Sequence, residues 1–300
     1  MGKGYLCIDG KHLNIIGRGI DGLYGEPYIS SIEYLDISEI AHEVSLDYSV
    51  FKNLKTLMIS SLETYTFPKE ICCLPLLEHI TCSGKCLIPS EIGKAPKLER
   101  LDTNGDCSLK MPESIAAIPT LKTLLVSYYG ETTPREMPKW ITKLSQLENL
   151  HLYLCFFSAI DPDINNLINL KTLSIIGALS AAHEFPVLSS LKKLERLEIT
   201  GDGFNGLPKP QYGLFQKVLD GIAELNTLTS LNLSEWRSRK KSDYLVLNEN
   251  GRSIPDIFYR YPNLVSLNLS GMNIDFLPPS VHGLRYLERL EVDGNNFTPQ

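Results

Sequence analysis

One six-residue pattern, Leu-x-x-Leu-x-Leu, recurs along the chain and constrains its fold more than any other feature. Clear copies start at Leu54, Leu121, Leu147, Leu170, Leu194, Leu228, Leu264 and Leu287, and weaker copies start at Ile32, Leu77 and Leu98. Leu54 and Leu77 are 23 residues apart, as are Leu147 and Leu170. A fixed period of this length indicates a repeat protein, in which each unit stacks on its neighbours.

The second half of each unit carries its own pattern, an apolar residue followed by Pro-x-x-Ile. Copies lie at residues 67–71, 88–92, 111–115 and 137–141, and a variant that ends in Val lies at 277–281. Proline is tolerated at the first position of a helical turn, because its missing N–H would have no partner there. Each unit is therefore predicted to be a strand, a turn and a short helix.

The stacking follows from what one unit cannot bury alone. Side chains at the first, fourth and sixth positions of the pattern point inward, whereas those at the third and fifth positions point to the opposite face. Neighbouring units together form a continuous core and a parallel sheet, with strands about 4.8 Å apart. Because the helical turns are wider than the strands, the sheet is expected on the concave face of a curved solenoid.

These units resemble leucine-rich repeats of the Leu-Pro-x-x-Ile type, as found in Ras-suppressor-like proteins, plant intracellular resistance receptors and bacterial effector proteins. The resemblance covers most of residues 32–297. It implies an α/β, right-handed solenoid with a concave parallel sheet and short convex helices. Residues 1–31 are then an N-terminal cap with a first strand at residues 5–8, and residues 32–300 hold about eleven units. Proteins of this family share a scaffold and differ in what they bind.

The resemblance also gives a role to residues just after the strands. An Asn or Cys there bonds to neighbouring turns and forms an internal ladder, which is the role predicted for Cys86, Cys107, Cys155, Asn273 and Asn296. The seven cysteines are an odd number without the spacing of a disulfide framework, so we expect an intracellular, cytoplasmic protein.

A zinc site is the alternative interpretation of the cysteines. It would combine Cys72, Cys73, Cys82 and Cys86 with His79. The repeat register places most of these cysteines in the core, where small apolar residues belong. We therefore predict neither a metal site nor a cofactor.

Composition narrows the class of partner. The chain is 43% hydrophobic and 21% charged, which is typical of a folded protein. Its formal net charge of −6 argues against nucleic acid as the partner. The sequence contains neither an N-terminal signal pattern nor an apolar stretch of about 20 residues, so no membrane contact is predicted.

Two long intervals interrupt the period, because 34 residues separate Leu194 from Leu228 and 36 separate Leu228 from Leu264. The insertion near 202–224 contains a helix-like segment, 214–222, that we expect to pack on the core. The insertion near 235–260 has Trp236 and Arg237 at the start of a basic run. It is either a solvated loop followed by a small hairpin or a secondary contact for an acidic partner or RNA.

Apolar and aromatic side chains gather on the predicted concave face, where most neighbours are polar. The predicted partner-binding residues there are Met58, Leu125, Tyr128, Tyr129, His151 and Tyr153. Aromatic side chains on such a surface are typical of protein-binding hot spots. The alternative for Tyr128 and Tyr129 is that they bend onto the turn and cover the edge of the core.

No nucleophile elbow, phosphate-binding loop or zinc-protease motif occurs in the sequence. Paired acids such as Asp161 and Asp163 are expected to be surface charges. We therefore predict a non-enzymatic protein-protein interaction module that binds a protein on its concave face. The alternatives are a ligand-sensing segment of a larger signalling or immune receptor, or a bacterial effector that targets host proteins.

The C-terminal end follows a strand directly and has no helical turn of its own. A bare end would expose the core, so we expect it to be covered by more chain, by a partner or by a second copy.

Overall fold

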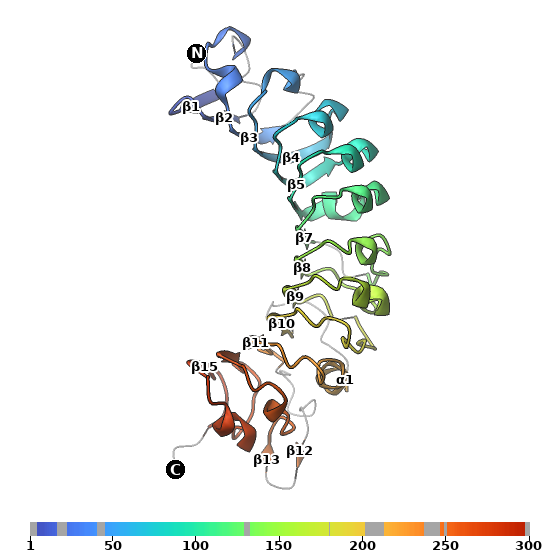
Figure 1. Cartoon of the computed structure of the whole chain (residues 1–300), viewed down its shortest axis with the longest axis vertical. Coiled ribbons are helices and arrows are strands. Elements are labelled where there is room, and N and C mark those ends of the chain that lie inside the picture. The colour runs from blue at the N-terminus through green and yellow to red at the C-terminus, as the bar shows by residue number, and fades with distance from the viewer. Residues whose placement is uncertain are drawn as a thin grey trace. The chain divides into compact units, whose positions relative to one another are not determined.

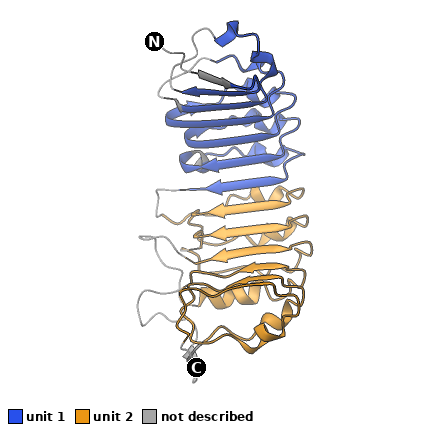
Figure 2. Ribbon diagram, turned by 90° about the vertical axis from the view of Figure 1, so that its left-hand side faces the viewer, with its two compact units in different colours: residues 1–130 blue, residues 131–300 orange. Residues whose placement is uncertain are grey.

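A computed structural model describes residues 5–16, 23–40, 46–128, 133–179, 181–201, 213–236, 247–248 and 251–297. The chain divides into two compact units, residues 1–130 (unit 1) and residues 131–300 (unit 2), coloured separately in Figure 2. Each unit is built from strands that stack side by side and short helices on the opposite side, as Figure 1 shows. The predicted leucine-rich-repeat solenoid is thereby confirmed within each unit.

Unit 1 is a sheet in the order of the sequence, in which every pairing except the first is parallel. Its strands are β1 (Tyr5–Ile8), β2 (His12–Ile16), β3 (Tyr34–Ile40), β4 (Thr56–Thr66), β5 (His79–Leu87), β6 (Arg100–Asn104) and β7 (Thr123–Ser127). Its 3-10 helices are η1 (Leu23–Gly25), η2 (Ile29–Ser31), η3 (Tyr48–Val50), η4 (Lys69–Cys73), η5 (Ser90–Lys94), η6 (Gly105–Leu109) and η7 (Glu113–Ala117). The predicted strand at residues 5–8 is confirmed, and it pairs antiparallel with β2.

Unit 2 has a parallel sheet and, in addition, a separate two-stranded hairpin and an α-helix. Its strands are β8 (Asn149–Tyr153), β9 (Thr172–Ile176), β10 (Arg196–Thr200), β11 (Ser230–Asn232), β14 (Ser266–Asn268) and β15 (Arg289–Glu291), with a separate hairpin of β12 (Leu247–Asn248) and β13 (Gly251–Arg252). Its helices are the 3-10 helices η8 (Ile141–Lys143), η9 (Pro162–Asn166), η10 (Phe258–Arg260) and η11 (Pro279–Gly283), and the α-helix α1 (Leu214–Gly221).

The 3-10 helices follow directly from the proline pattern. The backbone N–H of Ile92 donates to the carbonyl of Pro89 at 3.1 Å, and that of Ile115 donates to Pro112 at 3.2 Å. This is the three-residue hydrogen bond of a 3-10 turn. The isoleucine side chains are fully buried, so each turn anchors its unit to the core. The predicted short helices are confirmed, and they are 3-10 helices.

The core contains the inward positions of the repeat. Leu170, Leu173 and Ile175 of the β9 repeat are fully buried, as are the corresponding residues of the other internal repeats to within a few per cent. The repeat that contains β15 differs, because Leu290 is 38% exposed although it occupies the same position as Leu173. The last described repeat thus shows an apolar surface beside β15.

Both insertions have structure in their described parts. In α1, Leu214, Phe215, Val218 and Leu219 are buried, which confirms the predicted helix that packs on the core. The second insertion contains the predicted small hairpin, formed by β12 and β13, whereas the basic run before residue 247 lies outside the described residues.

Candidate functional site

Two rows of side chains cover the face of the unit 2 sheet that points away from its core, which we call the sheet face. The row at the third repeat position reads Asn149, Thr172, Arg196, Ser230, Ser266 and Arg289, and the row at the fifth position reads His151, Ser174, Glu198, Asn232, Asn268 and Glu291. Hydrogen bonding of the parallel strands keeps both rows in register from β8 to β15. The repeat pattern itself therefore aligns these side chains.

A groove of about 400 Å³ lies along these rows. Its walls and floor are formed by His151, Tyr153, Thr172, Ser174, Arg196, Leu197, Glu198, Ser230, Leu231, Asn232, Ser266, Asn268, Arg289 and Glu291. All of them belong to unit 2.

The β8 end of the groove is aromatic. The rings of His151 and Tyr153 are 5.9 Å apart between centroids, and the Tyr153 hydroxyl lies 3.4 Å from Nδ1 of His151. Both side chains are partly exposed. A tyrosine that offers both ring area and a hydroxyl is a common anchor in protein interfaces.

The centre of the groove is held by two asparagines. Asn232 Nδ2 donates to Glu198 Oε1 at 2.7 Å, and its Oδ1 accepts from the Ser234 N–H at 3.0 Å. Asn268 repeats this arrangement, with Nδ2 donating to a Glu291 carboxylate oxygen at 2.5 Å. Each amide thus fixes the orientation of a carboxylate on a neighbouring strand.

On the sheet face of unit 1, the charged side chains of β5 and β6 pair with one another. Arg100 Nε lies 2.9 Å from Asp102 Oδ2, and His79 Nε2 lies 3.3 Å from the same oxygen. Burial opposes ionisation of Asp102, but its bonds to His79 and Arg100 outweigh burial and lower the pKa of the carboxyl. On the same face, the sulfur of Met58 accepts a hydrogen bond from the Tyr34 hydroxyl at 2.5 Å.

The predicted aromatic cluster divides between the units. Leu125 and Tyr128 belong to unit 1, whereas His151 and Tyr153 belong to unit 2. Leu125 and Met58 are partly exposed on the unit 1 sheet face, but Tyr128 is only 4% exposed. The expected exposure of Tyr128 is therefore wrong, and its alternative, a side chain that covers the core edge, fits its burial. Tyr129 lies outside the described residues.

Trp236 requires a second correction. Its side chain is 8% exposed, its Nε1 donates to the Ile199 carbonyl at 2.9 Å, and its ring lies 5.0 Å from that of Phe215 between centroids. Gly201 permits this packing, because a Cβ there would lie 2.7 Å from the Trp236 Cα. Trp236 seals the core between α1 and β10 and is not an exposed contact. Arg237 lies outside the described residues.

In the last repeat the ladder residue is Asn295 and not the predicted Asn296. Asn295 Nδ2 donates to the carbonyls of Leu269 and Val292, and its Oδ1 accepts the N–H groups of Met272 and Ile274. The predicted Asn296 instead bonds to Asn273. With Leu287 as the first position of its repeat, Asn295 is the ninth, which is the position of the Asn or Cys in leucine-rich repeats. The prediction of Asn296 missed this spacing.

The cysteines form no metal site that the structure describes. The side chains of Cys72, Cys82, Cys86 and Cys155 are buried. The Cys86 thiol donates to the Ser83 carbonyl at 3.2 Å, and that of Cys155 donates to the Tyr153 carbonyl at 3.4 Å. Among the described residues, no group of His, Cys, Asp and Glu is arranged to hold a metal ion. The Cys107 side chain lies outside the described part.

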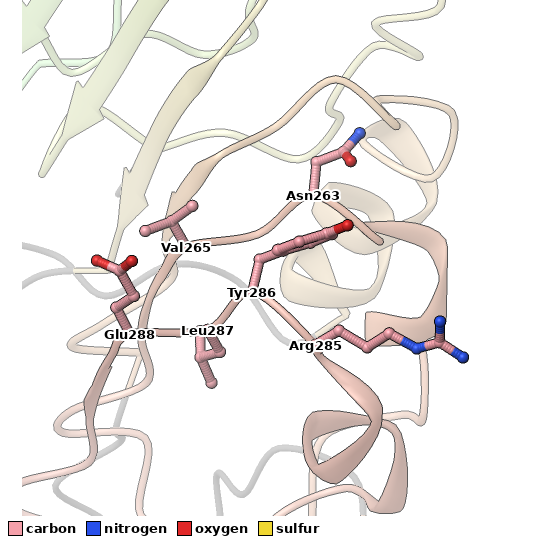
Figure 3. Close-up of a pocket in the computed structure, with 6 residues that line it drawn as sticks. All are labelled: Asn263, Val265, Arg285, Tyr286, Leu287 and Glu288. Carbon is pink, nitrogen blue, oxygen red and sulfur yellow. The ribbon is translucent and has the colours of Figure 1, made fainter.

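A second depression, of about 450 Å³, lies beside the last two described repeats (Figure 3). Its lining is Asn263, Val265, Arg285, Tyr286, Leu287 and Glu288. The Tyr286 side chain, 62% exposed, lies in Figure 3 between Asn263 and Arg285. No sequence pattern predicted this depression, because its lining residues precede the strands β14 and β15.

No described helix has both the length and the apolar character required to cross a bilayer.

Comparison with known sequences finds proteins of much greater length than this chain. No family model matches the chain. The chain is 28% identical over 296 residues to disease resistance protein RPS4B of Arabidopsis thaliana, covering 86% of this chain and 24% of that protein. It is 26% identical over 251 residues to TMV resistance protein N of Nicotiana glutinosa (78% and 18%) and 23% identical over 310 residues to an adenylate cyclase of Podospora anserina (96% and 13%). The chain spans a quarter or less of each relative.

Solved structures support the fold. A leucine-rich-repeat protein of Leptospira interrogans matches with a TM-score of 0.52 and 19% identity, covering 96% of this chain and 85% of that one. TLR13 in complex with ssRNA13 matches with a TM-score of 0.60 and 18% identity (96% and 38%). The ectodomain of the Arabidopsis receptor kinase HAESA, in complex with an IDA peptide hormone ligand that is lengthened at its N-terminus, matches with a TM-score of 0.52 and 22% identity (97% and 48%).

Proposed function

Because this chain has the leucine-rich-repeat fold, we propose that it is a protein-interaction module that holds an extended segment of a partner protein in the sheet-face groove of unit 2. The observation that carries the proposal is the groove itself, in which two rows of side chains stay in register over six strands beside an aromatic end. The HAESA ectodomain, with the same fold, is solved with a peptide hormone. Its likeness to this chain is one of fold.

The proposed activity is binding without catalysis. The carboxylates in the groove, Glu198 and Glu291, are held by asparagine amides, an arrangement that orients them and leaves no paired acid and base at one point. A protein partner is favoured over nucleic acid because the formal net charge of −6 gives the chain no general attraction to a phosphate backbone. An intracellular site of action is part of the proposal, supported by the odd number of cysteines, seven, and by their lack of the spacing of a disulfide framework.

A second candidate function is a recognition segment within a larger immune or signalling receptor. The likeness to two plant resistance proteins favours it, as does the small share of each that the chain spans. In such a receptor the groove would hold a segment of the receptor itself or of a foreign protein. The bacterial-effector hypothesis predicts a host protein in the same groove.

The test is selection of peptides from a random display library on the full chain, followed by measurement of Kd by fluorescence anisotropy. We expect Ser230→Trp, which fills the middle of the groove, to weaken the selected peptides at least tenfold, a loss of roughly 1.4 kcal/mol. Thr56→Trp introduces the same residue at the same repeat position of β4 in unit 1 and is the matched control. Equal affinity for both variants would reject the groove as the binding site.

A further inference from the structure

An Arg-Leu-acid sequence occurs three times on the sheet faces: Arg100 with Asp102 on β6, Arg196 with Glu198 on β10, and Arg289 with Glu291 on β15. In each copy the arginine takes the third repeat position and the acid the fifth. Both side chains therefore point to the same face, two residues apart on one strand. The three copies differ in whether the charges pair.

Two copies are closed ion pairs. The Arg100 guanidinium lies 2.9 Å from Asp102, and Arg289 is paired with Glu291. In the third copy Glu198 Oε1 accepts from Asn232. Among the described residues, the Arg196 guanidinium takes part in no ion pair and no hydrogen bond, although its backbone N–H donates to the Lys171 carbonyl. Arg196 thus presents an unpaired cation to the groove.

The neighbours of Arg196 suit an anionic group. Register places Thr172 of β9 on one side and Ser230 of β11 on the other, and all three line the groove. A planar guanidinium donates two parallel hydrogen bonds to a carboxylate, and the two neighbouring hydroxyl groups can donate further hydrogen bonds to it. The nearest groove carboxylate, Glu198, is already engaged by Asn232.

We propose that Arg196 is the specificity-determining residue of the groove and that it selects an acidic peptide segment, binding an Asp or Glu side chain with help from Thr172 and Ser230. This inference rests on the proposed function. A single carboxylate fits because Glu198, two residues from Arg196 on β10, already places one negative charge in the groove. A polyanion such as RNA would bring several charges close to Glu198, so the complementary ligand carries one or a few carboxylates spaced by neutral residues.

The experiment uses the peptides selected on the full chain, together with versions in which each Asp or Glu is replaced by Asn or Gln. We expect one acidic position to dominate, with its amide version binding about tenfold more weakly to the wild-type chain. Arg196→Gln should weaken the acidic peptide by a similar factor and leave its amide version unchanged. Repeating the selection on Arg196→Glu should yield peptides enriched in Lys or Arg.

Arg100→Gln is the matched control, because it removes an arginine at the same repeat position from the unit 1 sheet face. It should leave affinity within about twofold of wild type. Peptides that bind the groove, as shown by their loss with Ser230→Trp, but respond equally to Arg196→Gln in acidic and amide form would overturn the role of Arg196 and leave the proposed function standing. If no peptide is selected, or if Ser230→Trp has no effect, both proposals fail.

Discussion

Single side chains on neighbouring strands determine whether a charged side chain of the sheet face is held in a hydrogen bond. Asn232 and Asn268 occupy the same position on adjacent strands and hold Glu198 and Glu291, respectively. Each asparagine also accepts a backbone N–H two residues further on, so its amide has one orientation that satisfies both bonds. Hydrogen bonds to a charged group are stronger than neutral ones. The floor of the groove therefore owes its order to these residues.

The thiols show how burial controls reactivity at the scale of one residue. Burial raises the pKa of both Cys72 and Cys155 to about 12, so at about pH 8 both remain neutral thiols. Cys73 is exposed. We predict that iodoacetamide at this pH alkylates Cys73 and spares Cys72 and Cys155, as measured by mass spectrometry of tryptic peptides. Labelling in urea is the control, and equal rates for Cys73 and Cys155 in the native chain would contradict this account.

At this scale the sequence predicts position better than exposure. The repeat register correctly placed Met58, Leu125, His151 and Tyr153 on the sheet face. The exposure expected for Trp236 was wrong, because it depends on a close approach to Gly201 that no local pattern shows. The unpaired state of Arg196 was equally hidden, because three identical Arg-Leu-acid patterns differ only in tertiary partners.

The short elements of this chain are stable because they are stacked, since a 3-10 turn of five residues has little stability alone. In η5 the Pro89 carbonyl closes the turn and Ile92 inserts into the core, while Ser90 and Lys94 remain exposed. The 3-10 helix η5 thus anchors its repeat through one buried side chain, Ile92.

Removing that anchor should lower stability. We predict that Ile92→Ala reduces the free energy of unfolding by roughly 2 to 5 kcal/mol, because the side chain is fully buried and leaves a cavity. Urea denaturation followed by circular dichroism measures the change, and Ser90→Ala, an exposed position of the same turn, should shift the midpoint little. A similar midpoint for both variants would show that the turn does not anchor the repeat.

Element types were predictable where the pattern is regular and not where it lapses. The strands at Leu54, Leu147 and Leu170 and the helix at 214–222 follow from periodicity. Strand β2 was not predicted as part of the parallel array, although it pairs in parallel with β3. By that register its first repeat position is Gly10, where the leucine that marks other units is missing.

At the scale of the whole molecule, the repeat explains how the groove arises from the scaffold itself. Stacking multiplies one strand into an aligned surface, and variation at the third and fifth positions then sets what the surface binds. The fold was predictable because its signal repeats in the sequence. The partner was not predictable, because binding specificity depends on side chains that the fold leaves free to vary.

The central claim, that the sheet face of unit 2 holds a partner segment, is tested most directly by photo-cross-linking. A selected peptide that carries a benzophenone side chain is irradiated with the full chain, and the cross-linked residues are located by mass spectrometry. The account predicts cross-links in β8, β9, β10 and β11, and loss of these cross-links with Ser230→Trp. Cross-links on the 3-10 helices η8 to η11, or on unit 1, would contradict it.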